Sequence, residues 1–494
     1  MAADGAAIVL GALAALALPP WHLVPLLAVA VFGLFALIDA APCGWRGVRR
    51  AARRGYWFGF GYFALGLYWI TDAILVRAAQ FWWLVPFAVP LTALGLAVFI
   101  AAPAGLSRLF PRGLARVLGF AGLFTGFELV RGLALTGFPW NLWGSVWEVP
   151  GFAGDIFIQP AAWIGVYGLT FATVLVAGLL TLGRRGWVAA AAILVFWAAG
   201  GAARLQAPPP PTKFRVALVQ GDIPETMKFG PARALHIFEV YLRLTHHAAV
   251  EGQGHPLAIV WPETASPYLL ATDGAARAAI AAAAGPGVPV LAGSVRYDNA
   301  GRPRNSLIVV DGAGPPLAIY DKWHLVPFGE YQPAWLPLPI QVVPGGGFSA
   351  GPGPQTLQVA GLPPFGPLIC YEAIFSGEIV GAQRPAWLVN ITNDAWFGNT
   401  AGPRQHLAAA RLRAVEEGLP LLRAANTGIS AAFTARGRPV GRLPWGRRGV
   451  LMVRLPGALP PTFYSRFGLR IPGILAILGL VAGVAAGAIR ARSS

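Results

Sequence analysis

Long apolar runs fill most of the first 206 residues of the chain, and short polar or arginine-containing connections separate them. Residues 6–18 and 21–40 are two such runs, and the Pro19-Pro20 pair between them predicts a tight helical hairpin. Five further runs are each long enough to cross the ~30 Å hydrocarbon layer of a bilayer; they cover 56–76, 81–104, 117–136, 156–182 and 187–203. The pattern predicts about seven transmembrane helices within residues 1–206.

Beyond this bundle the pattern changes twice. The proline-rich segment 207–212 predicts a stiff linker. Residues 213–458 then show short β-rich runs separated by Gly/Pro turns, which is typical of an α/β domain. A last apolar run at 471–489 predicts a C-terminal transmembrane helix over 467–489. The expected fold class is a multi-span α-helical membrane bundle, about eight helices in all, joined to an external α/β domain.

Arginine clusters mark alternate connections of the bundle and predict its orientation. They lie in the second, fourth and sixth connections, at 46–54, 108–116 and 184–185. Cytoplasmic loops carry the excess of Lys and Arg, so the N-terminus is expected in the cytoplasm. Seven crossings then deliver the α/β domain to the outer face. The eighth returns the chain to Arg490 and Arg492, so both termini are expected to be cytoplasmic.

Composition agrees with a membrane protein and argues against other classes. Hydrophobic residues make up 56% of the chain, charged residues only 12%, and the mean hydropathy is +0.58. A net charge of +17 would suit nucleic acid, but the arginines lie between apolar runs, so we attribute the charge to topology and expect no nucleic-acid partner. Neither the two cysteines nor the seven histidines show metal-ligand spacing, so no metal or cofactor is expected. Cys43 follows Pro42 and reads as an ordinary loop thiol.

Two features of the bundle have alternative interpretations. Glu128 and Arg131 lie three residues apart on one face of the fifth run, where either a structural ion pair or headgroup recognition would explain them. The aromatic-rich segment 138–150 contains Trp140, Trp143 and Trp147. We interpret it as an interfacial belt, although the same side chains would suit a lipid entry.

Three segments of the α/β domain place a reactive side chain directly after an apolar strand. The strands and the residues that follow them are 257–261 with Glu263, 316–320 with Lys322, and 367–369 with Cys370. Because loops at strand ends gather catalytic groups, the three are candidates to converge. Taken singly, each residue also has a non-catalytic interpretation: Glu263 as a surface carboxylate, Lys322 as a solvated lysine and Cys370 as a buried thiol. Lys322 is one of only three lysines in an arginine-rich chain, and Cys370 is expected on a tight strand-to-helix turn.

A carboxylate, a lysine and a cysteine in this order resemble the nitrilase (carbon–nitrogen hydrolase) superfamily. The motifs that carry the resemblance are Trp261-Pro262-Glu263, the run 321–331, and Cys370-Tyr371-Glu372. With the N-terminal spans and the single C-terminal span, the whole chain resembles the apolipoprotein N-acyltransferase family of the bacterial inner membrane. The segments 393–398, 403–406 and 426–428 also resemble that family. The resemblance implies an αββα sandwich for the α/β domain.

The resemblance also implies roles for individual residues. Glu263 would be the proton acceptor, Cys370 the nucleophile, and Lys322 with the Tyr371 N–H the oxyanion partners. Supporting positions implied are Glu330, Tyr371, Glu372, Phe229 and Trp323. Phe229 stands where the family often has tryptophan, so the indole N–H is lost there. Candidate lid loops are 322–341, with Phe328 and Trp335, and the glycine-rich 344–354.

The implied reaction is ping-pong acyl transfer. A phospholipid would donate an acyl chain to Cys370, and the α-amine of the diacylglyceryl-modified N-terminal cysteine of an apolipoprotein would accept it. Two alternatives stay open: a membrane-tethered amidase or nitrilase, which shares the three residues but has no need of eight spans, and a transporter or receptor whose external domain only binds ligand. We expect a monomer in contact with the lipid bilayer.

Overall fold

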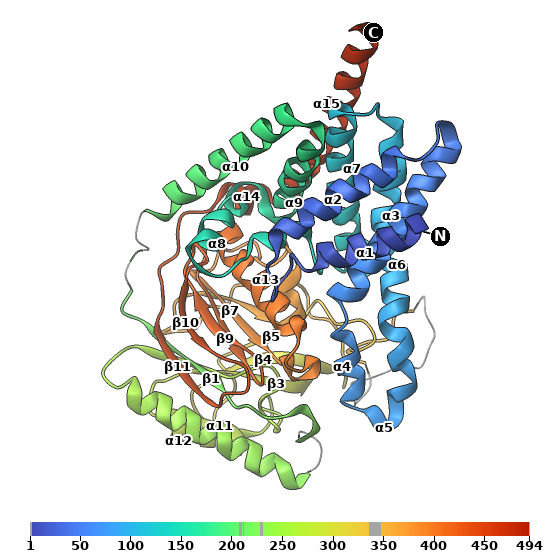
Figure 1. The fold of residues 1–494 in the computed structure, drawn as a ribbon. Helices are drawn as coiled ribbons and strands as arrows, with labels where there is room; N and C mark the ends of the chain where they lie inside the picture. Colours follow the sequence, from blue (N-terminus) through green and yellow to red (C-terminus); the bar gives the residue numbers. More distant parts are fainter. Residues whose placement is uncertain (1, 207–209, 211, 228–230, 335–346, 494) are drawn as a thin grey trace. The chain divides into compact units, whose positions relative to one another are not determined.

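A computed structural model describes residues 2–206, 210, 212–227, 231–334 and 347–493. By their internal contacts the described residues divide into two compact units. One comprises 1–71, 83–207 and 462–494, and the other 72–82 with 208–461. The segment 72–82, which the sequence places in the bundle, groups with the second unit, and Figure 1 shows the path of the whole chain. The domain boundaries expected from the sequence otherwise stay predictions.

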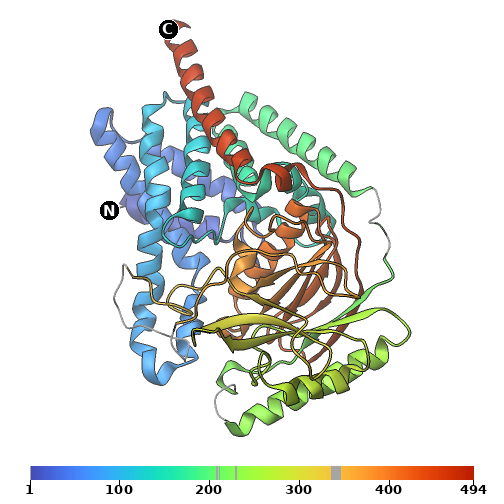
Figure 2. The same ribbon diagram turned by 180° about the vertical axis from the view of Figure 1, so that it is seen from behind.

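The first unit is helical, and each predicted span overlaps a helix. Its longer helices are α1 (Ala2–Ala15), α2 (Val24–Asp39), α3 (Gly44–Gly66), α6 (Val85–Leu106), α7 (Leu114–Leu133), α9 (Ala161–Leu179), α10 (Arg184–Leu205) and α15 (Arg470–Ser493). Shorter elements are η2 (Ser107–Leu109), η3 (Trp143–Trp147), α8 (Gly151–Phe157), η4 (Leu180–Leu182) and α14 (Phe463–Phe467). The connecting α4 (Ile70–Leu75), α5 (Ala78–Phe81) and η1 (Trp82–Leu84) lie around the unit boundary. Figure 2 shows α15 leading to the C-terminus.

Fewer helices meet the length and apolarity criteria for a membrane span than the sequence pattern predicts. Within the described ranges, four helical stretches have the length and apolarity to cross a bilayer, at 78–109, 161–182, 184–205 and 470–492. Helices α1 and α2 are shorter, and α3 carries an arginine cluster. The cluster at 46–54 lies inside α3 and not in a loop, because arginine is a good helix former. About eight spans therefore stays a prediction.

The Glu128–Arg131 pair is structural. Both side chains are nearly fully buried, and Arg131 Nη2 lies 3.5 Å from Glu128 Oε1. Arg131 Nη1 donates to the carbonyls of Phe138 and Trp140, each at 2.7 Å, and the backbone N–H of Trp143 donates to Glu128. The pair therefore ties the aromatic-rich segment to α7. Trp140 and Trp143 are buried core residues, so the interfacial interpretation is wrong for these two.

The second unit contains two mixed β-sheets. The six-stranded sheet has the order β11-β1-β2-β3-β4-β5, and the five-stranded sheet the order β10-β9-β8-β7-β6. The strands of the first are β1 (Arg215–Gln220), β2 (Leu257–Val260), β3 (Val290–Tyr297), β4 (Pro303–Val310), β5 (Ala318–Asp321) and β11 (Gly449–Arg454). Those of the second are β6 (Phe365–Ile369), β7 (Trp387–Thr392), β8 (Leu421–Ala425), β9 (Ser430–Phe433) and β10 (Pro439–Leu443). Each sheet joins three parallel strands to antiparallel neighbours.

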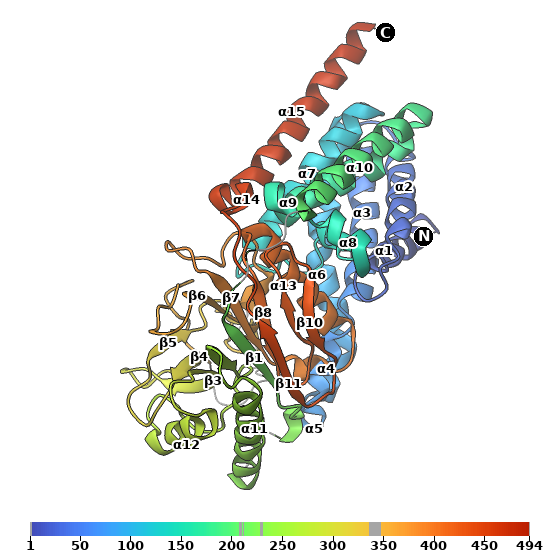
Figure 3. The same cartoon turned by 90° about the vertical axis from the view of Figure 1, so that its left-hand side faces the viewer.

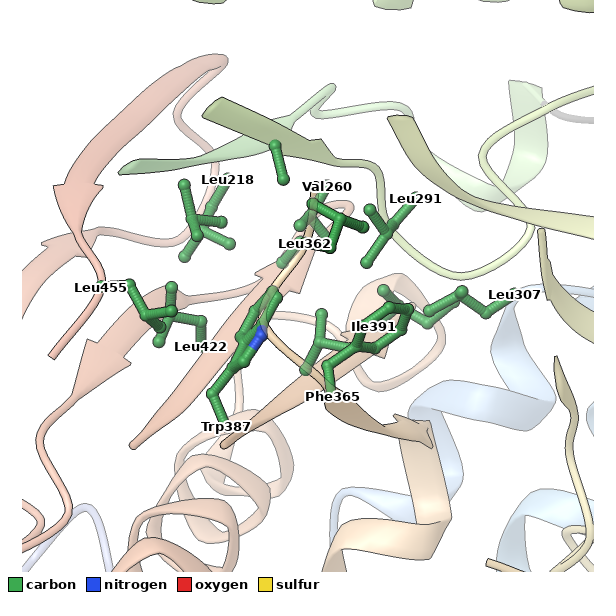
Figure 4. Packing of buried hydrophobic residues seen from close by; sticks show 14 of the residues in the cluster. Leu218, Val260, Leu291, Leu307, Leu362, Phe365, Trp387, Ile391, Leu422 and Leu455 are labelled. Carbon is green, nitrogen blue, oxygen red and sulfur yellow. The ribbon is translucent and has the colours of Figure 1, made fainter. Parts of the chain in front are cut away.

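The two sheets pack face to face, with helices on both outer faces (Figure 3). Alternate residues of β1 and β2, such as Leu218 and Val260, meet Trp387, Ile391 and Leu422 of the other sheet in a common core (Figure 4). Helices α11 (Pro231–Glu251) and α12 (Gly274–Ala284) cover the six-stranded sheet, and α13 (Ala401–Glu417) covers the five-stranded one. This arrangement is the αββα sandwich that the sequence resemblance implies.

Strand direction places two of the three candidate residues at the same end of the six-stranded sheet. Strands β1, β2 and β3 are parallel, β4 reverses, and β5 reverses again, so β2 and β5 point the same way. Their carboxyl ends carry Glu263 and Lys322. Strand β6, at the edge of the other sheet, ends at Ile369, immediately before Cys370.

Candidate active site

The Glu263 loop is held by close backbone packing. Trp261 is fully buried, and its indole N–H donates to the Thr245 hydroxyl at 2.8 Å. A Cβ built on Gly293 would lie 2.2 Å from the carbonyl oxygen of Pro262, so only glycine permits the loop to pass this close to β3. The buried Glu263 carboxylate accepts from the backbone N–H of Asn393 at 2.9 Å. The loop thus fixes the position of one carboxylate.

Lys322 lies between two carboxylates. Its Nζ is 3.2 Å from Glu263 Oε1 and 2.8 Å from Glu330 Oε2, and only 1% of the side chain is exposed. The preceding Asp321 is anchored by Arg296 and by the Ser306 hydroxyl, and the Lys322 N–H donates to the Asn305 carbonyl at 2.9 Å. The ammonium therefore has little freedom to move.

Glu330 and Asn305 complete this cluster. Asn305 Nδ2 donates to Glu263 Oε1 at 2.7 Å and to Glu330 Oε1 at 2.9 Å, so one amide bridges both carboxylates. The Val326 N–H donates to Glu330 Oε2 at 2.8 Å. The amide therefore holds both carboxylates in fixed positions beside Lys322.

Cys370 has a strained backbone at the end of β6. Its φ is +50°, a conformation that non-glycine residues seldom adopt and that clusters at functional sites. A short 3-10 turn, η6 (Cys370–Ile374), begins at this residue. The strand-to-helix turn expected from the sequence is confirmed, although the helix is a single 3-10 turn.

Glu372 joins the Cys370 turn to the Lys322 loop. Its carboxylate accepts from the N–H groups of Ile369 at 2.6 Å and Trp323 at 2.7 Å, and from the Tyr320 hydroxyl at 3.0 Å. Burial raises the pKa of Glu372 to about 7, against the effect of these donors. Two of the three reactive segments are therefore linked through one buried carboxyl group.

Burial and charge set the protonation states of Lys322 and Cys370. Burial alone would lower the pKa of Lys322, but Glu263 and Glu330 outweigh it and raise that pKa well above its ordinary value. Burial, and then the charge of Glu263, raise the pKa of the Cys370 thiol, and Lys322 only partly offsets them. The resting site therefore holds a charged ammonium and a neutral thiol.

A second buried network lies behind Cys370. His406, on α13, has Nε2 2.9 Å from the Cys370 carbonyl oxygen and Nδ1 3.0 Å from Asp394 Oδ1. Arg423 Nη2, on β8, contacts Asp394 Oδ2 at 2.6 Å and His406 Nδ1 at 3.1 Å. Burial would raise the pKa of Asp394, but Arg423 and His406 lower it to about 2. Asp394 begins η7 (Asp394–Phe397) within the family-like run 393–398.

The other candidate residues have mixed outcomes. The N–H of Trp323 binds Glu372, and its ring packs against the inter-sheet core. The Tyr371 ring is buried and meets Phe375 edge-on, with a centroid distance of 5.1 Å. Phe229, Trp335 and the rest of 335–346 lie outside the described residues. In the described part of the first candidate lid loop, residues 322–334, the Phe328 N–H donates a hydrogen bond to the Tyr331 carbonyl oxygen.

Comparison with known proteins places the chain in a family. Residues 10–179 match the sequence profile described as the apolipoprotein N-acyltransferase N-terminal domain, and residues 215–459 match that of carbon–nitrogen hydrolase. A protein of Bradyrhizobium diazoefficiens named apolipoprotein N-acyltransferase is 41% identical over 507 residues, which cover 97% of this chain and 94% of that protein. The chain belongs to the apolipoprotein N-acyltransferase family. Proteins of the same name from Brucella melitensis and Caulobacter vibrioides are 41% and 40% identical, covering 97% and 98% of this chain and 94% of each relative.

A solved amidase from Nesterenkonia sp. is similar to half of the chain. It is 21% identical, covers 50% of this chain and 92% of its own, and has a TM-score of 0.37. The family assignment rests on the curated relatives and not on this likeness.

Sequence reasoning missed part of the site. Asn305 is an inward-facing residue of β4, and a polar residue within a β-strand gives no signal of a catalytic neighbour. Glu225 accepts from Asn393 Nδ2 at 2.6 Å, and Arg423 sits in an otherwise apolar strand. His406, Asp394 and Asn426 fall within family-like motifs, but the motifs alone assign them no role. The signal in the sequence that could have revealed this network is a charged residue, Arg423, within a continuous apolar run, because a buried charge requires a partner.

Proposed function

We propose that this chain transfers an acyl chain from a phospholipid, through a thioester on Cys370, to the α-amine of the diacylglyceryl-modified N-terminal cysteine of an apolipoprotein. The observation that carries the proposal is the cluster of Glu263, Lys322 and Glu330, with Lys322 Nζ within 3.2 Å of both carboxylates and electrostatically coupled to Cys370. Its occurrence in a chain of the apolipoprotein N-acyltransferase family with apolar helices selects a lipid-linked reaction.

The first half-reaction begins with general base catalysis. Because the raised pKa keeps Cys370 as a thiol, attack on the ester carbonyl requires that its proton pass to Glu263 as the S–C bond forms. The negative charge moves to the carbonyl oxygen, where Lys322 and the Tyr371 N–H stabilise it. The tetrahedral intermediate then collapses, the ester C–O bond breaks, and Glu263 returns the proton to the leaving lysophospholipid oxygen.

Glu330 supports this step through charge. When Glu263 takes the thiol proton, Lys322 loses one ionised partner but keeps Glu330 at 2.8 Å. The ammonium therefore stays charged while the oxyanion exists, so it acts as an electrostatic partner and not as a base.

The second half-reaction reverses the proton flow. The acceptor amine attacks the thioester carbonyl and passes a proton to Glu263, the C–S bond breaks, and the thiolate of Cys370 takes that proton back. The products are an amide and the resting thiol. Exclusion of water by an apolar environment favours the amine over hydrolysis.

The proposed setting is the bacterial inner membrane. Catalysis takes place on the outer face, both termini are cytoplasmic, and the chain acts as a monomer. The arginine distribution supports this orientation.

Incubation with a phospholipid carrying a labelled acyl chain tests the proposal. Purified wild type and the matched control Cys43→Ala should each retain one hydroxylamine-labile acyl group, and Cys370→Ala none. Addition of a diacylglyceryl-cysteine peptide should then release the label as an amide. A wild type that stays unlabelled but hydrolyses small amides would favour an amidase, and the absence of both reactions would favour a binding protein.

A further inference from the structure

His406 has an unexplained place directly behind the nucleophile. It is 1% exposed, and its neighbours Asp394 and Arg423 are fully buried, so all three are out of reach of solvent. None of them is needed to pass a proton between Cys370 and Glu263. A buried network of this kind is costly unless its hydrogen bonds define a specific geometry.

The contact of His406 with Cys370 fixes the proton on one ring nitrogen. The Cys370 carbonyl oxygen only accepts hydrogen bonds, so the 2.9 Å contact requires a proton on Nε2. Arg423 Nη2, which only donates, lies 3.1 Å from Nδ1 and suits a neutral ring with Nδ1 as acceptor. A fully protonated ring would instead donate from Nδ1 to Asp394. Both states keep the Nε2–H directed at the Cys370 carbonyl.

That carbonyl belongs to the same peptide unit as the Tyr371 N–H. The only cis peptide bond among the described residues is Pro19–Pro20, so the Cys370–Tyr371 bond is trans. In a planar trans peptide the C=O and N–H point in opposite directions, and holding one fixes the other. A donor on the carbonyl also polarises the peptide and strengthens its N–H as a donor, by roughly 10–30% for a chain of hydrogen bonds.

We propose that His406 is a positioning residue that fixes and polarises the Cys370–Tyr371 peptide, so that the Tyr371 N–H is directed at the oxyanion formed during acyl transfer. The inference rests on the proposed function, because it assumes acylation of Cys370. It also explains how a residue with φ of +50° holds its peptide in one orientation. Arg423 and Asp394 act one step further back, by orienting the imidazole.

Two variants distinguish the effect of the His406 hydrogen bond from the effect of its side-chain volume. His406→Leu fills similar space without a donor, whereas His406→Gln retains an N–H that reaches toward the carbonyl. We expect His406→Leu to lower the rate of thioester formation about 10- to 100-fold, less than the ~10²–10³-fold loss on removing an oxyanion donor itself. KM for phospholipid should stay near the wild-type value, and His406→Gln should recover most of the rate. His406→Leu is matched by His236→Leu on the exposed face of α11, which should have no effect.

Alkylation of Cys370 by iodoacetamide distinguishes positioning from a general structural role. This displacement at an sp³ carbon uses the same thiol and base but forms no oxyanion. His406→Leu should therefore be alkylated at a rate within about 2-fold of wild type while acylation is slow. Equal losses in both reactions would overturn the proposal, as would normal acylation in His406→Leu.

A spectroscopic measurement keeps the inference testable if His406→Leu does not accumulate. The chain has two cysteines, so Cys43→Ala labelled with carbonyl-¹³C cysteine carries one label, at Cys370. The carbonyl stretch should show a hydrogen-bonded Cys370 oxygen in this background and in its His406→Gln derivative. A carbonyl frequency typical of no hydrogen bond would refute the inference. Failure of the wild type to form a thioester would instead refute the proposed function.

Discussion

Lys322 keeps its positive charge because two carboxylates outweigh the cost of burying it. Glu263 and Glu330 approach Nζ from different segments, and Asn305 holds both carboxylates in place. A compact ammonium fits between them, whereas a planar guanidinium is larger and has fixed donor directions. At the scale of single residues, the site depends on shape as well as on charge.

Replacement of Lys322 by arginine tests this dependence. Lys322→Arg should form the thioester at least ~10²-fold more slowly than wild type, because in the proposed mechanism the oxyanion loses a correctly placed partner. The measurement is a single-turnover labelling rate, with Lys213→Arg as the control. Near-normal acylation of Lys322→Arg would show that Lys322 is not the oxyanion partner.

Single residues were predictable where they follow an apolar strand. Glu263, Lys322 and Cys370 each stand after a strand, and the structure brings the first two within 3.2 Å. Asn305 was not predictable, because its contacts depend on which strands are neighbours. The second network was hidden for the same reason, since Asp394, His406 and Arg423 come from three separate elements.

Among the elements, α13 combines a buried face with several titratable groups. Burial, and then the neighbouring charge of Glu416, raise the pKa of Glu417 from 4.5 to about 7. A carboxyl with a raised pKa binds its proton more tightly in the folded chain than in the unfolded chain. Its contribution to stability is therefore complete below pH 4.5 and is lost as the pH rises toward 7.

The Glu417→Gln variant should remove this pH dependence. The melting temperature of Glu417→Gln should exceed that of wild type by more at pH 8 than at pH 5. The corresponding difference in the free energy of unfolding is at most about 3 kcal/mol, at about 1.4 kcal/mol per pKa unit. Thermal unfolding of the full chain in detergent, with the exposed Glu239→Gln as control, measures the difference. An equal shift at both pH values would contradict the assignment to Glu417.

The positions of individual strands and helices were more predictable than their pairing. Alternating and continuous apolar runs located the strands before Glu263, Lys322 and Cys370 to within a few residues. The sheet order was not available from these runs, because pairing depends on contacts distant in sequence. The arginine cluster at 46–54 was wrongly predicted to lie in a connecting loop. It lies within α3, because arginine is a good helix former.

At the scale of the whole molecule, the arginine clusters predict the orientation of the chain in the membrane. Cys43 is exposed and precedes the first cluster, so it should lie on the cytoplasmic side. In a Cys370→Ala background, a membrane-impermeant maleimide should label Cys43 in lysed but not in intact spheroplasts.

A cysteine introduced into the α/β domain should show the opposite labelling pattern to Cys43. Asp311→Cys, at an exposed turn of the α/β domain, should be labelled in intact spheroplasts when both natural cysteines are replaced by alanine. Labelling of Cys43 in intact spheroplasts would reverse the proposed topology.

The pairing of β1 with β11 has a consequence for biosynthesis. The first strand of the domain is completed by the last, and the Thr212 hydroxyl binds the carbonyl of Leu455, 243 positions later in the chain. Until the ribosome has passed β11, β1 presents an unpaired edge, which is prone to association with other chains. Almost the entire domain must therefore be synthesised before the six-stranded sheet can close. A chain that ends before β11 leaves the β1 edge unpaired, so we expect it to misfold and not to form a shorter enzyme.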